Sequence, residues 1–230
     1  MIETVNGIRL HYEVSGKGRH LILLHGNGED LHIFDEAVQV LKQFYTCWQI
    51  DSRCHGKSEK TAELHYRDMA DDVLAFMEAH DMHDAAVLGF SDGGIIALIA
   101  ASATDRITSV IAAGANMTPD GVVLKLGLMI QLVSLFKKDM YLELMRKEPD
   151  LTAQELGRIK ADVLLTVGQH DLIRLKHTRQ MQALIPNCSL KVLPSEDHGS
   201  YIVQTNKIAG IVTGFLMRRQ ISVSKETRLC

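Results

Sequence analysis

A glycine-rich turn places one serine where a nucleophile is expected. The stretch from Val87 to Leu98 is an apolar run, a Gly-x-Ser-x-Gly turn around Ser91, and a second apolar run. This pattern is typical of a sharp turn from a strand into a helix, which lifts the serine hydroxyl above the edge of a sheet. Gly89 and Gly93 are expected beside the serine because the two backbones approach too closely there for a side chain. Ser91 is therefore the candidate nucleophile.

Two later residues supply the partners that a serine nucleophile needs. Asp171 follows the apolar run at 163–168, and His198 follows the apolar run at 188–193. The carboxyl ends of parallel strands meet at one edge of a sheet, so these residues and Ser91 are expected to converge. A serine hydroxyl needs a base, which makes His198 the candidate base and Asp171 the residue that orients its imidazole. This chemistry requires no metal ion and no organic cofactor.

A second glycine-rich loop, His25-Gly26-Asn27-Gly28, follows the apolar run at 20–24. Its glycines leave backbone N–H groups free to approach a substrate. We expect the backbone N–H groups of Asn27 and Asp92 to bind the oxyanion of a tetrahedral intermediate, since Asp92 begins the helix after the nucleophile. His25 is a candidate substrate contact. An ordinary turn into the next helix explains this loop equally well.

The side chain of Asp92 has two interpretations. The favoured one is that Asp92 caps the helix that it starts, where a negative charge is stabilised. The other is that its carboxylate pairs with a substrate ammonium group, as an α-amino ester would provide. A selective loss of amino-ester hydrolysis in D92N would support the second interpretation, and equal losses on neutral and amino esters would contradict it.

The order of apolar runs predicts the fold class. Continuous apolar runs alternate with helical patterns, which predicts an α/β protein with a mainly parallel central sheet flanked by helices. Asn6-Gly7 between two short strand patterns predicts an N-terminal antiparallel hairpin. Helices are expected at 33–44, 66–79 and 201–217.

The alternation stops at 116–156, where no strand pattern is found. Two helical patterns occur there, at 121–136 and 139–147. The sequence therefore predicts a core formed by residues 1–115 and 157–230, with a short helical cap at 116–156.

This cap is expected to lie over the nucleophile. An insertion that follows a sheet strand lies over the carboxyl end of that strand, so the cap would cover Ser91. For most of the apolar residues of its first helix we favour packing against the core, with lining of a substrate pocket as the alternative. The candidate substrate contacts are Met129 and Val133, and the other apolar residues are Val122, Leu126, Ile130 and Leu135.

Two polar loops have the composition of functional clusters. Asp, Arg and His occur together at 51–58, and two His with two Asp occur at 80–84. We favour a structural role for the first loop, because a polar loop at a strand end needs internal hydrogen bonds. For the second we favour a solvated connection over a metal site.

The composition limits the partners. The chain has 230 residues, 46% of them hydrophobic, and a net charge of -3, which suits one domain and argues against nucleic acid or an anionic membrane as a partner. No apolar stretch is long enough to span a membrane, and the first residues do not read as a signal peptide. The four cysteines show no paired spacing, so we expect reduced thiols and a cytoplasmic protein. A small-molecule substrate and a monomer or homodimer are expected.

These motifs give the chain a specific resemblance. In their order and identity, they resemble the α/β-hydrolase superfamily over almost the whole chain. Within it, the Ser-Asp-Gly-Gly turn and the following apolar helix are most similar to small cap-bearing serine esterases of the valacyclovirase type. The matching stretches are His25–Gly28, Asp51–Ser58, Gly89–Gly94, Val167–Asp171 and Asp197–Gly199.

The resemblance implies an α/β-hydrolase fold with a Ser91, Asp171 and His198 triad in the family's order along the chain. The chain departs from the family pattern at Cys54, because the family usually has a glycine at this position. If that position requires positive φ, Cys54 is strained. The cap is also shorter than is usual in the family.

The sequence therefore predicts a serine hydrolase that cleaves a small carboxylic ester through an acyl-enzyme intermediate. A thioesterase, an amidase, a C–C hydrolase or a cofactor-free perhydrolase would use the same triad. A ligand-binding protein with a vestigial site is a further alternative. A haloalkane dehalogenase is disfavoured, because its nucleophile would be a carboxylate and this turn carries Ser91.

Overall fold

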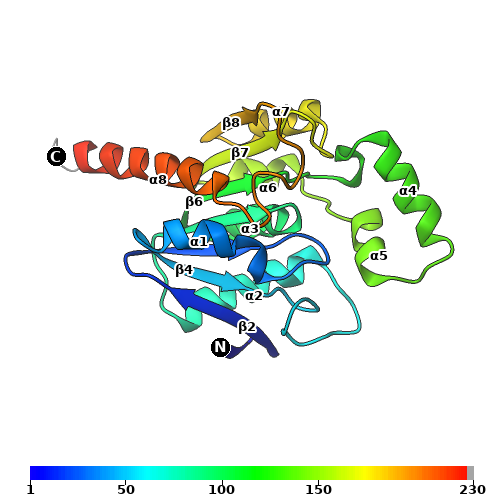
Figure 1. Ribbon diagram of the computed structural model, residues 1–230, viewed down its shortest axis with the longest axis horizontal. Coiled ribbons are helices and arrows are strands. Elements are labelled where there is room, and N and C mark those ends of the chain that lie inside the picture. Colours follow the sequence, from blue (N-terminus) through cyan, green and yellow to red (C-terminus); the bar gives the residue numbers. More distant parts are fainter. Residues whose placement is uncertain (227–230) are drawn as a thin grey trace.

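The computed structural model describes the backbone of residues 1–226 and the side chains of residues 1–218. Within them an eight-stranded sheet has the order β1-β2-β4-β3-β5-β6-β7-β8 (Figure 1). The hairpin of β1 and β2 is antiparallel and joins β4 in antiparallel fashion, and the other pairs are parallel. The predicted fold class is thereby confirmed. The strands are β1 Ile2–Val5, β2 Ile8–Ser15, β3 Arg19–Leu24, β4 Tyr45–Ile50, β5 Ala85–Phe90, β6 Ile107–Ala113, β7 Asp162–Gly168 and β8 Cys188–Leu193.

Helices cover both faces of the sheet, and none of those in the described residues is long and apolar enough to cross a membrane. The α-helices are α1 Asp35–Leu41, α2 Tyr66–Ala79, α3 Asp92–Ala103, α4 Leu124–Ser134, α5 Met140–Lys147, α6 Ala153–Arg158, α7 Leu175–Leu184 and α8 Lys207–Glu226. Two short 3₁₀ helices are η1 Leu31–Phe34 and η2 Pro119–Gly121.

The central strands bury their side chains on both faces, which explains their continuous apolar runs. In β3, Ile22 and Leu24 belong to the core under α2 and α3, whereas Leu21 and Leu23 belong to the core under α1 and α8. All four side chains are fully buried. A polar residue at any of these positions would lie in an apolar layer without a partner.

The turn between β5 and α3 is as tight as the glycine pattern predicts. A Cβ on Gly89 would lie 2.1 Å from the carbonyl oxygen of Gly93, and a Cβ on Gly93 would lie 2.0 Å from the carbonyl oxygen of Leu24. The neighbouring Ser91 takes φ 51° and ψ −113°, a strained combination for a residue with a side chain. Close backbone packing therefore places this serine at the carboxyl edge of the sheet.

Three predicted helix ranges need correction. The helix predicted at 201–217 begins at Lys207, because Gln204 has positive φ and its N–H bonds to Ile33 instead of continuing a helix. The range 33–44 holds the end of η1 followed by α1, because Asp30 caps η1 through the N–H of His32. The range 121–136 starts its helix only at Leu124, after η2.

The segment between β6 and β7 holds α6 in addition to the two helices expected there. Thr152 and Glu155 form a reciprocal capping box that starts α6. The prediction at 66–79 is confirmed by α2. Cys47, Cys54 and Cys188 are free thiols, and Cys230 lies outside the described residues.

The tight turn gives a stability prediction. We expect G93A to lower the free energy of unfolding by about 3 kcal/mol or more, because the added methyl group meets backbone atoms that cannot move aside. The measurement is urea unfolding at equilibrium. G210A is the matched control, since Gly210 is exposed on α8 and a Cβ there meets nothing within 4 Å. It should raise stability by about 0.5–1 kcal/mol. Equal effects of the two changes would contradict this account.

Candidate active site

The structure brings the three predicted triad residues into a chain of hydrogen bonds. Ser91 follows β5, Asp171 follows β7 and His198 follows β8. Nε2 of His198 lies 3.1 Å from Oγ of Ser91, and Nδ1 of His198 lies 2.6 Å from Oδ1 of Asp171. These distances place a base beside the hydroxyl and a carboxylate behind the base.

Backbone groups hold the carboxylate of Asp171 in place. Its Oδ2 accepts from the N–H of Gly168 at 2.9 Å, and its Oδ1 accepts from the N–H of Ile173 at 2.9 Å. The side chain of Asp171 is 1% exposed, against 18% for that of His198. The carboxylate is therefore shielded from water, whereas the imidazole reaches the cavity.

A glycine at the end of β6 makes room for the imidazole. Gly114 has φ +62°, and a Cβ there would lie 2.7 Å from Cε1 of His198. The ring of Phe90 also packs against the imidazole, with its centroid 5.0 Å from that of His198. The orientation of His198 thus depends on one missing side chain and one aromatic neighbour.

The two expected oxyanion donors both lie at the candidate site. Asn27 and Asp92 line the same cavity as Ser91. Among the described residues, neither of these backbone N–H groups makes a hydrogen bond within the protein. The loop before Asn27 is held by Glu29, whose Oε2 accepts from the N–H of Gly26 at 2.9 Å. Burial raises the pKa of the Glu29 carboxyl, and the bond from Gly26 opposes that shift.

The cavity beside Ser91 has a volume of about 440 Å³ and is lined mostly by apolar side chains. Helices α4 and α5 contribute Leu126, Ile130 and Met145 to its wall. No lysine or arginine is among its lining residues, and its carboxyl groups come from Glu29, Asp92 and Glu148. A small, largely apolar molecule fits such a site.

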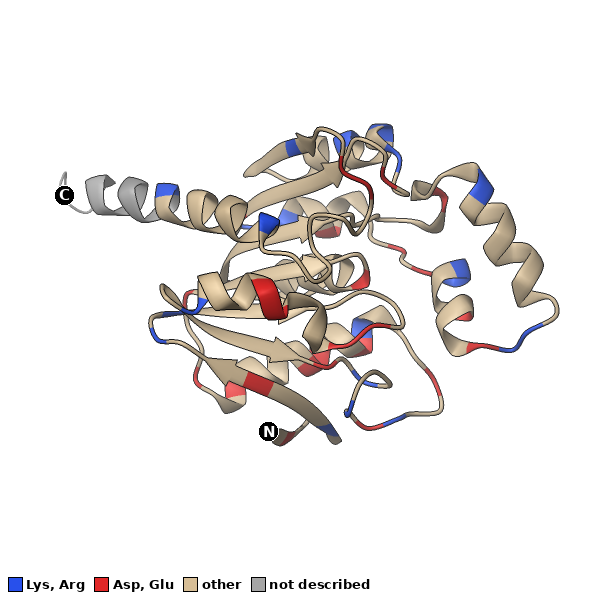
Figure 2. Ribbon diagram, in the orientation of Figure 1, with Lys and Arg blue, Asp and Glu red and all other residues tan. Residues whose placement is uncertain are grey.

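Met129 and Val133 do not line this cavity, contrary to the prediction. They are 53% and 37% exposed, on the outer side of α4, while Leu126 and Ile130 face the cavity. The prediction failed because α4 is apolar around most of its circumference, so its sequence does not indicate which side faces inward. In Figure 2, α4 carries almost no charge along its length.

His25 is a structural residue and not a substrate contact. It is 1% exposed and does not line the cavity. Its Nδ1 lies 2.8 Å from the carbonyl oxygen of Gly26, and its Nε2 accepts from the N–H of Ser52 at 3.0 Å. Burial lowers the pKa of His25 to about 4, so the ring is neutral at neutral pH. It joins the loops after β3 and β4.

Asp92 does not act as a cap. The residue at the N-cap of α3 is Ser91, and no side chain makes a capping bond there. The carboxylate of Asp92 instead accepts from Oη of Tyr66 at 2.8 Å and from Nδ2 of Asn27 at 2.8 Å. Burial raises the pKa of Asp92, and these two hydrogen bonds oppose that shift.

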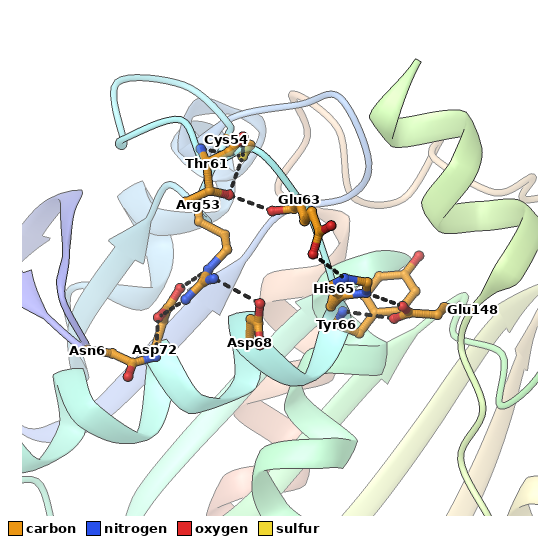
Figure 3. Close-up of polar contacts among 10 residues, drawn as sticks. All are labelled: Asn6, Arg53, Cys54, Thr61, Glu63, His65, Tyr66, Asp68, Asp72 and Glu148. Carbon is orange, nitrogen blue, oxygen red and sulfur yellow. Dashed lines mark hydrogen bonds and ion pairs between the residues drawn. The ribbon is translucent and has the colours of Figure 1, made fainter. Parts of the chain in front are cut away.

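The loop at 51–58 is a network of internal hydrogen bonds, as expected. The carboxylate of Asp51 accepts from the N–H groups of Leu31 and Lys57. Nε and Nη2 of Arg53 each donate to the carboxylate of Asp72 at 2.6 Å, and Nη1 donates to the carboxylate of Asp68 at 3.0 Å (Figure 3). These contacts fix the loop after β4 on α2.

Cys54 has φ 66°, the strained conformation expected where a cysteine replaces glycine. Its thiol accepts from the N–H of Thr61 at 3.2 Å, and its carbonyl oxygen accepts from Oη of Tyr141 at 2.6 Å. These contacts stabilise the strained position and connect it to α5. In the second polar loop, exposed His83 pairs with Asp81 at 3.0 Å, and the described residues contain no cluster of three potential metal ligands.

Three site residues were missed by the sequence analysis, namely Glu29, Tyr66 and Glu148. Tyr66 begins an amphipathic helix and resembles an ordinary core residue in sequence. Glu148 precedes a proline directly after α5, and only folding brings it to α2. Figure 3 shows its carboxyl group beside His65 and Tyr66. Of the three, only Glu29 had a signal in the sequence, because it directly follows the motif at 25–28.

Comparison with known proteins places the chain in a family. A sequence model described as the alpha/beta hydrolase fold matches residues 19–144, and the chain belongs to this family. Human serine hydrolase BPHL is 36% identical over 107 residues, which are 43% of this chain and 36% of that protein. The pimeloyl-[acyl-carrier protein] methyl ester esterase of Vibrio campbellii is 34% identical over 104 residues, 44% of this chain and 39% of that protein. The matches thus span little more than a third of these relatives.

Solved structures show the same fold over nearly the whole chain. The meta-cleavage product hydrolase CumD of Pseudomonas fluorescens IP01 superposes with a TM-score of 0.79, 18% identity, and coverage of 95% of this chain and 98% of that one. The enol-lactonase of Burkholderia xenovorans LB400 gives 0.78 with 20% identity, covering 94% and 100%. At this level of sequence identity, the similarity to these structures shows the fold alone.

A contact between Glu148, after α5, and His65, before α2, predicts a pH effect. Nδ1 of His65 lies 2.6 Å from Oε1 of Glu148, which raises the pKa of His65 above its usual 6.5. The contact therefore stabilises the fold fully below that value, and its contribution is lost as the pH rises through the raised pKa. H65Q should cost less than about 1 kcal/mol, since His65 is half-exposed, and the cost should vanish at alkaline pH.

Thermal unfolding at about pH 5.5 and about pH 9 measures this difference. E148Q serves as the control, because its amide oxygen still accepts from the backbone of Tyr66 while the charge is gone. In that background the pH-dependent effect of H65Q should be much smaller, because only Asp68 and Glu63 still raise the pKa of His65. A cost of H65Q that grows with pH would show that the pair is not the cause.

Proposed function

We propose that the chain is a serine hydrolase that cleaves small carboxylic esters. The observation that carries the proposal is the continuous chain of hydrogen bonds from Ser91 through His198 to Asp171, at the wall of an apolar cavity. The family supports it, and so do the activities for which its relatives are named, which include a serine hydrolase and a methyl ester esterase.

The first half of the reaction forms an acyl-enzyme. Oγ of Ser91 attacks the ester carbonyl carbon while Nε2 of His198 takes the hydroxyl proton. The carbonyl oxygen becomes an oxyanion, for which the backbone N–H groups of Asn27 and Asp92 are the donors. The bond to the alcohol oxygen then breaks, and His198 passes its proton to the leaving alcohol.

The second half repeats these steps with water. His198 takes a proton from a water molecule, whose oxygen attacks the acyl carbon. The bond between that carbon and Oγ of Ser91 breaks, the carboxylic acid leaves, and the proton returns to the serine. Throughout, the ionised carboxylate of Asp171 holds Nδ1 protonated and stabilises the imidazolium.

A fluorophosphonate probe tests the nucleophile. We expect labelling of the folded protein at Ser91, located by peptide mapping, and no labelling of S91A, because only an activated serine reacts with such a probe. Failure to label the folded wild-type protein would contradict the proposal and favour a ligand-binding protein. An ester panel of graded acyl length, with thioesters and amides beside it, then identifies the preferred bond.

The role of Asp171 gives a quantitative prediction. D171N should lower kcat for the best ester by roughly 10³–10⁴-fold, because an asparagine favours the wrong tautomer of His198. D105N is the matched control, since Asp105 lies on the surface in a contact with Lys160. If the two variants hydrolyse the ester at similar rates, Asp171 is not part of the machinery.

A further inference from the structure

The two residues that supply the oxyanion donors are bonded to each other through their side chains. Nδ2 of Asn27 donates to Oδ2 of Asp92 at 2.8 Å, although 65 positions separate them in sequence. Asn27 lies in the loop after β3, and Asp92 is the first residue of α3. This one bond therefore joins the two elements whose backbone N–H groups are the proposed oxyanion donors.

A third residue holds the other oxygen of the same carboxylate. Oη of Tyr66 donates to Oδ1 of Asp92 at 2.8 Å, and both side chains are buried, with Tyr66 1% exposed and Asp92 5% exposed. Burial, together with the neighbouring Asp92 charge, raises the pKa of Tyr66 well above 10, so its hydroxyl remains a donor. Each oxygen of Asp92 thus has a donor from the protein itself.

The position of Tyr66 is set in turn by the cap. Its backbone N–H donates to Oε2 of Glu148 at 3.0 Å, and the other oxygen of Glu148 contacts His65 (Figure 3). A continuous series of contacts therefore runs from the end of the cap through α2 to the first residue of α3 and the loop after β3.

We propose that Asp92 is a positioning residue whose carboxylate fixes the spacing of the two oxyanion donors, with Tyr66 as its support. The proposal rests on the hydrolase function proposed above and goes beyond it, because it assigns the carboxylate to the protein and not to a substrate amine. A buried carboxylate with both oxygens paired keeps its geometry, and an oxyanion hole is effective only when its donors are already in place.

This role predicts which kinetic constant changes. Donors that are misplaced by a fraction of an ångström still admit the ester but bind the oxyanion less well. Loss of the brace should therefore lower kcat and leave KM nearly unchanged. If Asp92 instead bound a substrate amine, its loss would raise KM, and only for esters that carry an amine.

A swap of the two side chains tests the bond directly. N27D places two carboxyl groups against each other, and D92N places an amide against the amide of Asn27. The double variant N27D/D92N restores an N–H···O bond with its direction reversed, while the amide oxygen at 92 still accepts from Tyr66. Each single change should lower kcat by about 10²-fold on neutral and amino esters alike. The swap should recover at least about tenfold of that loss.

Y66F provides an independent variant, because it removes one hydroxyl and leaves the ring in place. It should lower kcat by about tenfold with KM unchanged. Y45F is the matched control: Tyr45 is buried at the start of β4, away from the carboxyl ends of the strands, and should retain full activity. The affinity for a boronic acid that mimics the tetrahedral intermediate should fall in parallel with kcat.

Two results would overturn the proposal. One is a loss in D92N confined to amino esters, which would make Asp92 the amine ligand. The other is a swap that is no better than its worse single variant. Urea unfolding of the same four proteins separates this question from the proposed function. If the wild-type protein fails to react with a fluorophosphonate, a favourable coupling between positions 27 and 92 in the free energy of unfolding still supports the brace, and its absence rejects it.

Discussion

The close approach of α3 to the backbone of β3 and β5 is the constraint on which the rest of this structure depends. Without side chains at Gly89 and Gly93, the helix packs directly on the sheet, and Ser91 is held in a conformation that serine otherwise avoids. The strain is compensated by the surrounding packing, since α3 is buried along nearly its whole length.

Around that point the chain assembles its site from segments that are distant in sequence. Three strand ends carry the candidate nucleophile, acid and base, and helices α4 and α5 supply part of an apolar wall. Glu148, which follows α5, is bonded to the start of α2, and Tyr66 connects α2 to Asp92. The roof of the cavity and the expected oxyanion donors are thus joined through hydrogen bonds as well as through packing.

Much of the fold was predictable because its signals are local and repeated. Apolar runs of strand length, the Asn6-Gly7 turn and the helix at 66–79 each follow from short-range patterns, and all were found in place. The predicted triad positions follow from the same logic, because parallel strands must end at one edge. Cys54 was expected to be strained from its place in a motif, and its φ is positive.

The predictions that were wrong concern residues whose orientation and partners are set by tertiary contacts. Met129 and Val133 lie on a helix that is apolar on several sides, so periodicity did not determine its rotation. His25 was a candidate substrate contact, but its ring bonds to the loops after β3 and β4. Asp92 was expected to cap its helix, and no local pattern indicates that Tyr66 from α2 reaches its carboxylate.

The most direct test of the account is intact-protein mass spectrometry during turnover of a short-chain aryl ester. The account predicts a transient population carrying one acyl group, located on Ser91 by peptide mapping and absent from S91A. Hydrolysis that proceeds at the wild-type rate in S91A, or an acyl group carried on another residue, would contradict the central claim that Ser91 is the nucleophile.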